Sequence, residues 1–561
     1  MKNICNFFLL ILSVSLLTAA CGNEENRSKF CFDYLAVQLE EGDYWSIMDA
    51  NGNIVVEKEY APDNELSIPY GKGIYWVKAN NKRTLYSVDS PKKPLTKEEY
   101  DDVTEFDNGR AFVSKSGEPI QMIGTDGDVI KTLDRSIKKV FMFSDGMAKF
   151  VSLKANKPVY GFLDLDGDIA IDAQYDEASF FNEGYAVVKN ETDKKQNYQV
   201  IDKSGEIVGE IDASKYEIEG TLGNYDYFAE GKIAVKKKND AQNSTLVFLN
   251  TKGEEVVGPF ERTSPFSHFF AGFAVVHSDD YEDAYIIDEQ GNNIVRKSKY
   301  DHVYPLGKGE FLVEKNDKRG VIDSEDNCIV DFVYDDGLQG KLGDNYIMIN
   351  DGYAMLVGPD GEEIKNTEFK GMEKGGASGF VVFVDVEAIV DEFLKPINTK
   401  GYSTLKGKTI AKEIAPLVGA NMEKHTTYED IMKGNSFFAD DCQVSVAYYF
   451  DKPVKKEKTH IEEVNDGWFA TKRVVHDGYE WNEDANLLGV HQYAVIPSFT
   501  DSEKVWSVMK NALEKKGFKC KVDEDGEYFI STDGKRLSVG CEVSQYENEC
   551  SFAVTFILNK K

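Results

Sequence analysis

The chain has 561 residues, of which 29% are charged and 42% are hydrophobic, and its formal net charge is -32. This composition is typical of globular proteins, and the length allows more than one hydrophobic core. So large a negative charge repels the phosphates of nucleic acids and of anionic lipids, and we therefore expect no nucleic-acid partner.

The first twenty residues have the pattern of a bacterial export signal. A positively charged start is followed by an apolar run over 7–17 that is too short to span a bilayer comfortably. Residues 17–21, Leu-Thr-Ala-Ala-Cys, resemble the lipobox of bacterial lipoproteins, in which the cysteine is acylated and becomes the new N-terminus. The resemblance implies a signal peptide over 1–20, a lipid on Cys21 and a tether over 21–31. An ordinary signal peptide with an incidental cysteine is the alternative.

Nine copies of one sequence unit follow, between residues 32 and 384. The clearest copy, 160–188, reads YGFLDLDGDIAIDAQYDEASFFNEGYAVV, and apolar residues alternate within it as they do in strands. The predicted hairpin turn of the unit recurs about every 39 residues, a period that is typical of repeat architectures. The turn lies at positions 49, 89, 124, 164, 202, 250, 288, 323 and 358. Each unit is expected to form three or four short strands joined by tight turns.

Three acidic residues of the clearest copy, Asp164, Asp166 and Asp168, are compatible with a calcium loop or with a turn. An EF-hand loop starting at Asp164 needs glycine at its sixth position and glutamate at its twelfth, where this chain has isoleucine and tyrosine. Another copy has Lys252 at the place of Asp166, and a lysine cannot replace a calcium ligand. What recurs is Asp or Asn followed three residues later by Gly, which predicts capped turns and no metal site.

The repeated phrases resemble the WG (KWG) repeat family of bacterial proteins. Residues 159–188 fit best, and KRGVID at 318–323 and YDHV at 300–303 fit as well. The resemblance implies a β-repeat domain over 32–384 with a binding or scaffolding role and without catalytic residues.

Units of this length with about four strands suit the blades of a β-propeller, whose closure removes exposed strand edges. We therefore expect a mainly β chain with a β-propeller, and an open β-solenoid is the alternative. Strand-like stretches at the two ends, 34–37 and 380–384, are candidates for the strands that close the ring.

Residues 385–561 have a different pattern, which predicts an α+β domain with an antiparallel sheet and an unknown role. The expected helices lie at 386–394, at 405–418, and between a capping box at Thr500 and Glu503 and a stop at Gly517. The expected strands lie at 443–450, 467–475, 487–496, 518–523, 527–531, 536–543 and 551–558.

Few side chains in this domain indicate chemistry, and we expect no cofactor. His460 and the two glutamates that follow it resemble a metal or acid–base cluster, although a solvated loop has the same composition. Trp468, Tyr479 and Trp481 either form a surface for sugars or pack across strands. The cysteines expected to pair, or else to remain buried thiols, are Cys520, Cys541 and Cys550.

Binding on repeat scaffolds is concentrated in the connections between strands. The most irregular connections predict ligand-binding aromatic residues at Tyr225, Tyr227, Phe228 and Tyr281. We therefore expect a binding or scaffold lipoprotein of the cell envelope whose partner is a protein or a glycan. We expect it at the outer membrane or cell surface, attached to the membrane only through its N-terminal lipid. The alternative is an extracytoplasmic hydrolase acting on glycan or peptide, with its site in 385–561.

Overall fold

The computed structural model places two groups of elements, one before and one after residue 382. The described residues are 31–67, 69–70, 73–80, 82–115, 117–154, 157–190, 197–218, 227–238, 245–260, 268–277, 284–295, 299–307, 309–372, 379–383, 387, 428–433, 443–450, 452, 455–465, 470–482, 487–496, 502–523, 526–530, 536–543 and 550–557. No helix in these ranges is long and apolar enough to span a membrane.

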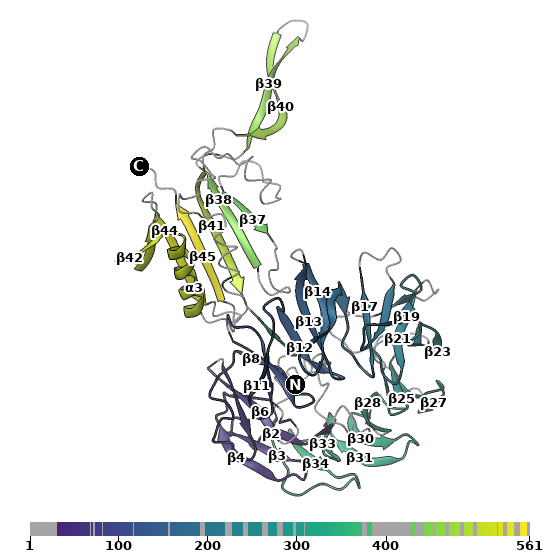
Figure 1. Ribbon diagram of the computed structural model, residues 1–561. Helices are drawn as coiled ribbons and strands as arrows, with labels where there is room; N and C mark the ends of the chain where they lie inside the picture. The colour runs from purple at the N-terminus through teal and green to yellow at the C-terminus, as the bar shows by residue number, and fades with distance from the viewer. Residues whose placement is uncertain are drawn as a thin grey trace. The chain divides into compact units, whose positions relative to one another are not determined.

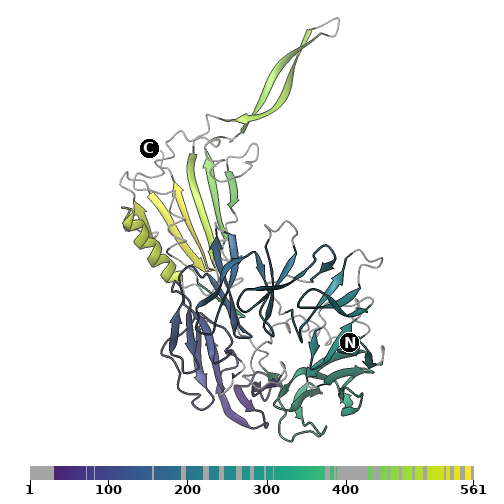
Figure 2. The same cartoon turned by 45° about the vertical axis from the view of Figure 1, so that its right-hand side comes forward.

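Nine small antiparallel sheets succeed one another along residues 34–357 and form the blades of a β-propeller (Figures 1 and 2). The strands of blades 1–5, each blade written from its centre outward, are β2 (Tyr34–Gln38), β3 (Trp45–Asp49) and β4 (Ile54–Tyr60); β5 (Glu65–Leu66), β6 (Ile74–Ala79) and β7 (Lys82–Ser87); β8 (Asp102–Val103), β9 (Arg110–Ser114), β10 (Gln121–Gly124) and β11 (Val129–Thr132); β12 (Lys139–Ser144), β13 (Met147–Lys154), β14 (Lys157–Leu163) and β15 (Ile169–Tyr175); and β16 (Glu177–Ala178), β17 (Tyr185–Lys189), β18 (Tyr198–Asp202) and β19 (Ile207–Ile211). Those of blades 6–9 are β20 (Tyr216–Glu217), β21 (Lys232–Lys237), β22 (Leu246–Asn250) and β23 (Glu255–Phe260); β24 (Phe269–Phe270), β25 (Phe273–His277), β26 (Ala284–Asp288) and β27 (Asn293–Val295); β28 (His302–Gly307), β29 (Glu310–Lys315), β30 (Lys318–Asp323) and β31 (Cys328–Tyr334); and β32 (Asp336–Leu342), β33 (Asn345–Asn350) and β34 (Tyr353–Val357).

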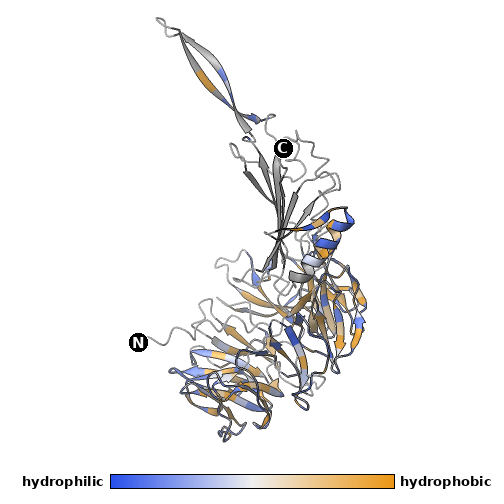
Figure 3. Ribbon diagram, turned by 90° about the vertical axis from the view of Figure 1, so that its left-hand side faces the viewer, coloured by the Kyte–Doolittle hydropathy of each residue, from blue (hydrophilic) through white to orange (hydrophobic). Residues whose placement is uncertain are grey.

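Burial distinguishes the inner from the outer strands of a blade. In β12 every residue after Lys139 is buried, whereas in the outer strand β15 exposed residues alternate with buried ones. Figure 3 shows hydrophobic residues on many strands of the repeat region. Neighbouring blades pack these residues against each other; the rings of Phe112 and Phe143, for example, join blades 3 and 4 with centroids 4.9 Å apart. Each large apolar side chain buried in this way stabilises the ring by about 1.5–3 kcal/mol.

Both ends of the repeat region close the ring. The short strand β35 (Gly371–Met372) pairs with β2 of blade 1, and β1 (Cys31–Phe32) pairs in parallel with β32 of blade 9. Residues from both ends share one apolar cluster, which includes Phe32, Leu35, Leu342 and Phe369. The nine-bladed propeller is thereby confirmed, and the open solenoid is excluded.

Of the two stretches expected to close the ring, only the first one does so. Residues 34–37 belong to β2, which pairs with β35 where the ring closes, but Phe380–Val382 form β36, which pairs with β12 of blade 4. The apolar pattern of these stretches recurs in the second strand of most blades. It therefore indicates a strand, but it does not identify the strand's partner.

The predicted turns are confirmed by their hydrogen bonds. Asp164 Oδ1 accepts the backbone N–H groups of Asp166 and Asp168, each at 2.9 Å, and Gly167 adopts a left-handed φ of 71°. The same side-chain cap recurs at Asp49, Asp202, Asn250, Asp288 and Asp323. These side chains thus hold the outer hairpins in shape.

The contacts divide the chain into two units, with the main boundary between Val382 and Phe383. The second unit contains a seven-stranded sheet of order β37-β38-β41-β45-β44-β43-β42, a separate hairpin β39-β40, and the helix α3. Their bounds are β37 (Tyr428–Lys433), β38 (Gln443–Phe450), β39 (Lys455–Asn465), β40 (Ala470–Trp481), β41 (Leu487–Ile496), α3 (Ser502–Lys515), β42 (Lys519–Asp523), β43 (Gly526–Ile530), β44 (Arg536–Val543) and β45 (Cys550–Ile557).

The helix α3 is amphipathic, as its mixed colours in Figure 3 show. It buries Met509 and Leu513 and ends at Lys515, two residues before Gly517, which has a left-handed φ of 89°. The expected helices at 386–394 and 405–418, and the cap residue Thr500, lie outside the described residues, apart from Glu387.

Candidate functional site

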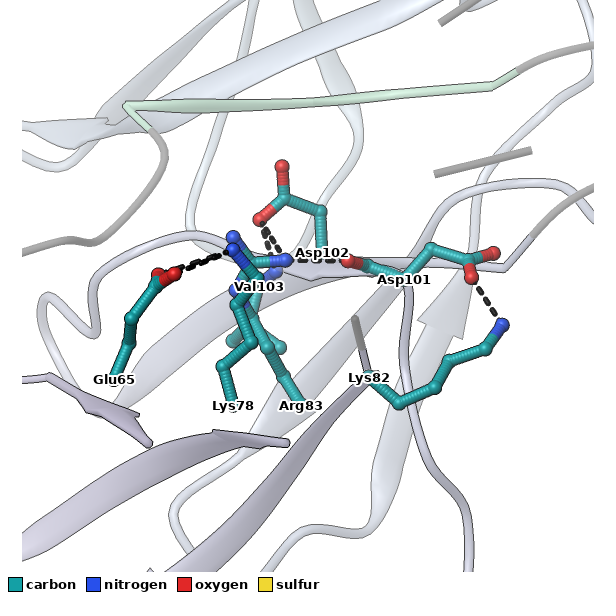
Figure 4. Close-up of polar contacts among 7 residues, drawn as sticks. All are labelled: Glu65, Lys78, Lys82, Arg83, Asp101, Asp102 and Val103. Atoms are coloured by element: carbon teal, nitrogen blue, oxygen red, sulfur yellow. Dashed lines mark hydrogen bonds and ion pairs between the residues drawn. The ribbon is translucent and has the colours of Figure 1, made fainter. Parts of the chain in front are cut away.

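A buried ion cluster joins blades 2 and 3 (Figure 4). Lys82 and Arg83 begin β7, and Asp101 and Asp102 stand at the start of β8, so the packing of the two blades brings them together. Arg83 Nη1 lies 3.1 Å from Asp102 Oδ1 and also donates to the Asp101 carbonyl, while Lys82 pairs with the Asp101 carboxylate. The Arg83 guanidinium lies 5.0 Å from the Trp76 ring centroid. We call this cluster a joint between blades, because its ion pairs connect residues of blade 2 with residues of blade 3.

The same residue types meet again between blades 8 and 9. Lys318 Nζ lies 2.6 Å from Asp335, and Arg319 Nη1 lies 2.6 Å from Asp336 Oδ1. Both joints have Lys-Arg at the start of a third strand, and both have a Tyr-Asp-Asp stretch that leads into the next blade. The repeat phrase KRGVID at 318–323 contains Lys318 and Arg319, but its pattern does not identify Asp335 and Asp336 as their partners. The recurrence of Lys-Arg and Asp-Asp in two copies was the signal that could have revealed the joints.

A second series of contacts links the inner turns of successive blades. In each, the acidic residue of one turn accepts the backbone N–H of a glycine in the next blade's turn. The pairs are Asp145 with Gly184 at 2.5 Å, Glu183 with Gly231 at 3.1 Å, and Glu230 with Gly272 at 2.9 Å. These contacts extend from blade 4 to blade 7 and fix the inner turns relative to one another.

Two lysines and three phenylalanines gather on β12, β13, β36 and the connection between β16 and β17. We name them the blade 4 cluster: Lys139, Lys149, Phe141, Phe180 and Phe380. Lys139 Nζ lies 3.6 Å from the Phe380 centroid, and Lys149 Nζ lies 4.3 Å and 3.9 Å from those of Phe141 and Phe180. Lys149 is 1% exposed and donates to the Ala178 carbonyl at 3.1 Å. Burial lowers the pKa of Lys149 well below its ordinary value, and Lys139 lowers this pKa further.

Two carboxyls with raised pKa values, those of Glu105 and Asp107, follow the inner strand β8 of blade 3. Burial raises the pKa of Glu105 to about 8, with a further contribution from the charge of Asp107. Burial also raises the pKa of Asp107 to about 6, although its hydrogen bond from Asn108 acts in the opposite direction. Glu105 therefore favours its protonated form at neutral pH.

The predicted ligand-binding residues are only partly described. Tyr227 and Phe228 are 7% and 1% exposed and pack in the apolar cluster between blades 5 and 6, so their rings are core residues. Phe228 precedes Ala-Glu-Gly as Phe181 precedes Asn-Glu-Gly, and this repeat phrase could have revealed its burial. Tyr225, Tyr281 and the predicted lipidation residue Cys21 lie outside the described residues.

In the second unit His460 pairs with Asp477 across the hairpin β39-β40, with Nδ1 and Oδ2 2.6 Å apart. The two side chains are 49% and 33% exposed. Of the three cysteines expected to pair, Cys520 is half-buried, and the side chains of Cys541 and Cys550 lie outside the description. Across the described ranges, no group of three or more His, Cys, Asp or Glu residues is arranged to hold a metal ion.

Comparisons with known proteins support the repeat assignment. The family described as "WG containing repeat" matches residues 97–118 and 160–192. A search of curated proteins found no match.

Several solved structures are similar over much of their length. One described as a eukaryotic initiation factor is 9% identical, covers 61% of this chain and 98% of its own, and has a TM-score of 0.39. The C-terminal WD40 domain of Sif2 is 12% identical, with 50% and 91% covered and a TM-score of 0.30. Hsv2p of Kluyveromyces lactis is 14% identical, with 45% and 89% covered and a TM-score of 0.25. The strand pairing itself establishes a propeller of nine blades, and WG-type repeat sequence is present within it at 97–118 and 160–192.

Proposed function

We propose that the protein is a lipoprotein of the cell envelope that binds a protein or glycan partner through its propeller. The closed ring is the observation that carries the binding role. Its blades are joined by buried apolar clusters and by ion pairs, so the frame is complete without a partner. A rigid frame of this kind supports binding because it loses little conformational freedom when a ligand docks.

The anchoring part of the proposal rests on the Leu-Thr-Ala-Ala-Cys stretch at 17–21. Two acyl chains hold a protein stably on a bilayer, whereas one does not. In cells fed a labelled fatty acid, we expect label on the wild-type protein and none on Cys21→Ala, which should leave the membrane fraction. Label that persists in Cys21→Ala, or that is absent from the wild type, contradicts the anchor.

The binding role is tested with the mature chain carrying Cys21→Ala, which removes the lipid but retains both structural units. Arrays of envelope proteins and of glycans are probed with this chain, and we expect saturable binding to one class. Binding without chemical change supports a scaffold. Cleavage of an arrayed glycan or peptide contradicts it and favours the hydrolase alternative.

A further inference from the structure

Blade 4 has an additional strand on its inner side. Within the described residues it is the one blade with five strands, in the order β15-β14-β13-β12-β36. Lys139, Val140 and Phe141 of β12 pair with Val382, Val381 and Phe380, and the Met142 N–H donates to the Gly379 carbonyl at 2.9 Å. We name this inner side of β12, residues 139–142, the channel edge of blade 4.

The ring does not need β36 in order to close. The strand β35 already completes blade 1, β1 already lies beside β32 of blade 9, and blade 4 has four strands of its own. The strand β36 therefore occupies the channel edge as an added ligand strand would, through main-chain pairing and side-chain contacts.

The contacts of β36 define what this edge accepts. Val381 and Val382 are 0% and 2% exposed, so the occupant contributes apolar side chains. The Phe380 ring lies 5.6 Å from the Phe141 ring, and Lys139 lies over the Phe380 face. An aromatic residue opposite Phe141 thus makes both a ring contact and a cation–π contact.

We propose that the channel edge of blade 4 is a peptide-binding edge and that β36 is its intramolecular occupant. The partner is a protein that inserts an extended apolar segment, with an aromatic residue opposite Phe141, in place of β36. This assignment rests on the proposed binding function and specifies its partner class. Because the second unit begins at the residue after Val382, a partner at this edge also changes how that unit is tethered.

A reversible disulfide between β12 and β36 tests whether β36 must leave the channel edge before a peptide can bind there. The Met142–Gly379 hydrogen bond makes 139–382 a non-hydrogen-bonded pair, whose Cα atoms are about 4.5 Å apart in antiparallel sheets. That spacing lies within the range of about 4.4–6.8 Å that a disulfide spans. The locked protein is therefore the mature chain carrying Lys139→Cys and Val382→Cys, with the cross-link verified by mass spectrometry. Lys139→Cys alone is the matched control.

The probe is a fluorescent peptide with the sequence of residues 377–385, and a peptide with aspartate at the positions of Phe380 and Val381 is its control. We expect Phe380→Ala to bind the probe at least tenfold more tightly than the wild type does, because this change weakens only the internal competitor. The oxidised lock should bind no probe, and reduction should restore binding to the level of Lys139→Cys.

Equal binding by the oxidised and reduced lock overturns the proposal, and so does the absence of binding by both Phe380→Ala and the reduced lock. If Phe380→Ala instead forms a dimer that the oxidised lock does not form, the occupant is a second copy of this chain, and the partner assignment is wrong. The arrays of envelope proteins and glycans distinguish this proposal from the proposed function. If an arrayed partner binds the oxidised lock as tightly as the wild type, the scaffold function is retained, but the channel edge of blade 4 is not its binding site.

Discussion

The two ion-paired joints of the propeller have the same residue types but different surroundings. Between blades 2 and 3, Arg83 and Asp102 each have side chains that are 10% exposed. Between blades 8 and 9, Arg319 and Asp336 are 18% and 35% exposed, and Arg319 has a second acidic partner in Glu314, 3.1 Å away. One motif therefore makes a buried joint and a half-exposed joint. Burial and the number of partners, rather than the residue types, determine how much each ion pair matters.

The largest effect is expected for Asp102→Ala, which leaves the Arg83 charge buried without that carboxylate. Breaking a buried pair from one side costs about 3–5 kcal/mol. The free energy of unfolding of the mature protein, followed by urea titration and tryptophan fluorescence, should fall by that amount. A loss below about 1 kcal/mol would show that the joint behaves like a surface pair.

Glu105 extends the comparison to a buried carboxyl for which no ion pair is described. It lies in blade 3, as Asp102 does, and burial disfavours its charged form. Its pKa is raised to about 8, so the folded protein binds this proton more tightly than the unfolded chain does. The associated stability is complete below the unfolded pKa, near 4.5, and is lost as the pH rises to about 8.

Glu105→Gln has no such proton to lose. We expect the variant to match the wild type near pH 5 and to exceed it by about 1–2 kcal/mol near pH 8, a value reduced by the residual exposure of the side chain. Unfolding titrations at both pH values make this measurement. A difference that does not change with pH would mean that Glu105 is charged throughout the range.

Asp336→Ala, the counterpart of Asp102→Ala, should cost about 1 kcal/mol. Arg319 is partly solvated and keeps Glu314, so its charge is not left unpaired. The same urea titration measures the change. A cost equal to that of Asp102→Ala would show that the motif matters more than its burial.

The smallest effect is expected for Lys318→Ala. Lys318 and Asp335 are 41% and 45% exposed, and exposed pairs are worth about 0.5 kcal/mol or less. Its effect should shrink further in 0.5 M salt, because screening is nearly complete at that ionic strength. A larger or salt-independent loss would assign the side chain a packing role instead.

Much of the fold could be predicted because each blade repeats the same local signals. Alternating apolar residues marked the strands, and the Asp-x-x-Gly phrase marked hairpins such as Asp164–Gly167. In the second unit the expected strands 443–450, 487–496 and 536–543 coincide with β38, β41 and β44. These features are local, so a single stretch of sequence contains them.

Partners that lie far apart in the sequence could not be predicted in the same way. The strand pattern of Phe380–Val382 does not specify whether it pairs in blade 1 or blade 4, because the choice depends on where the closed ring places β12. The burial of Tyr227 and Phe228 was missed because the surrounding residues were interpreted as an irregular loop. The Arg83–Asp102 pair required two copies to be aligned before its charges could be matched.

Hydrogen exchange of the intact mature protein tests the central claim, a closed ring with a separable inner strand, most directly. Local openings have their own free energies, which exchange rates report. We predict that the amides of β36 exchange at least tenfold faster than those of β35, while the inner strand β12 remains protected. Protection of β36 equal to that of β35 would contradict the account, because β36 would then open only when the whole ring opens.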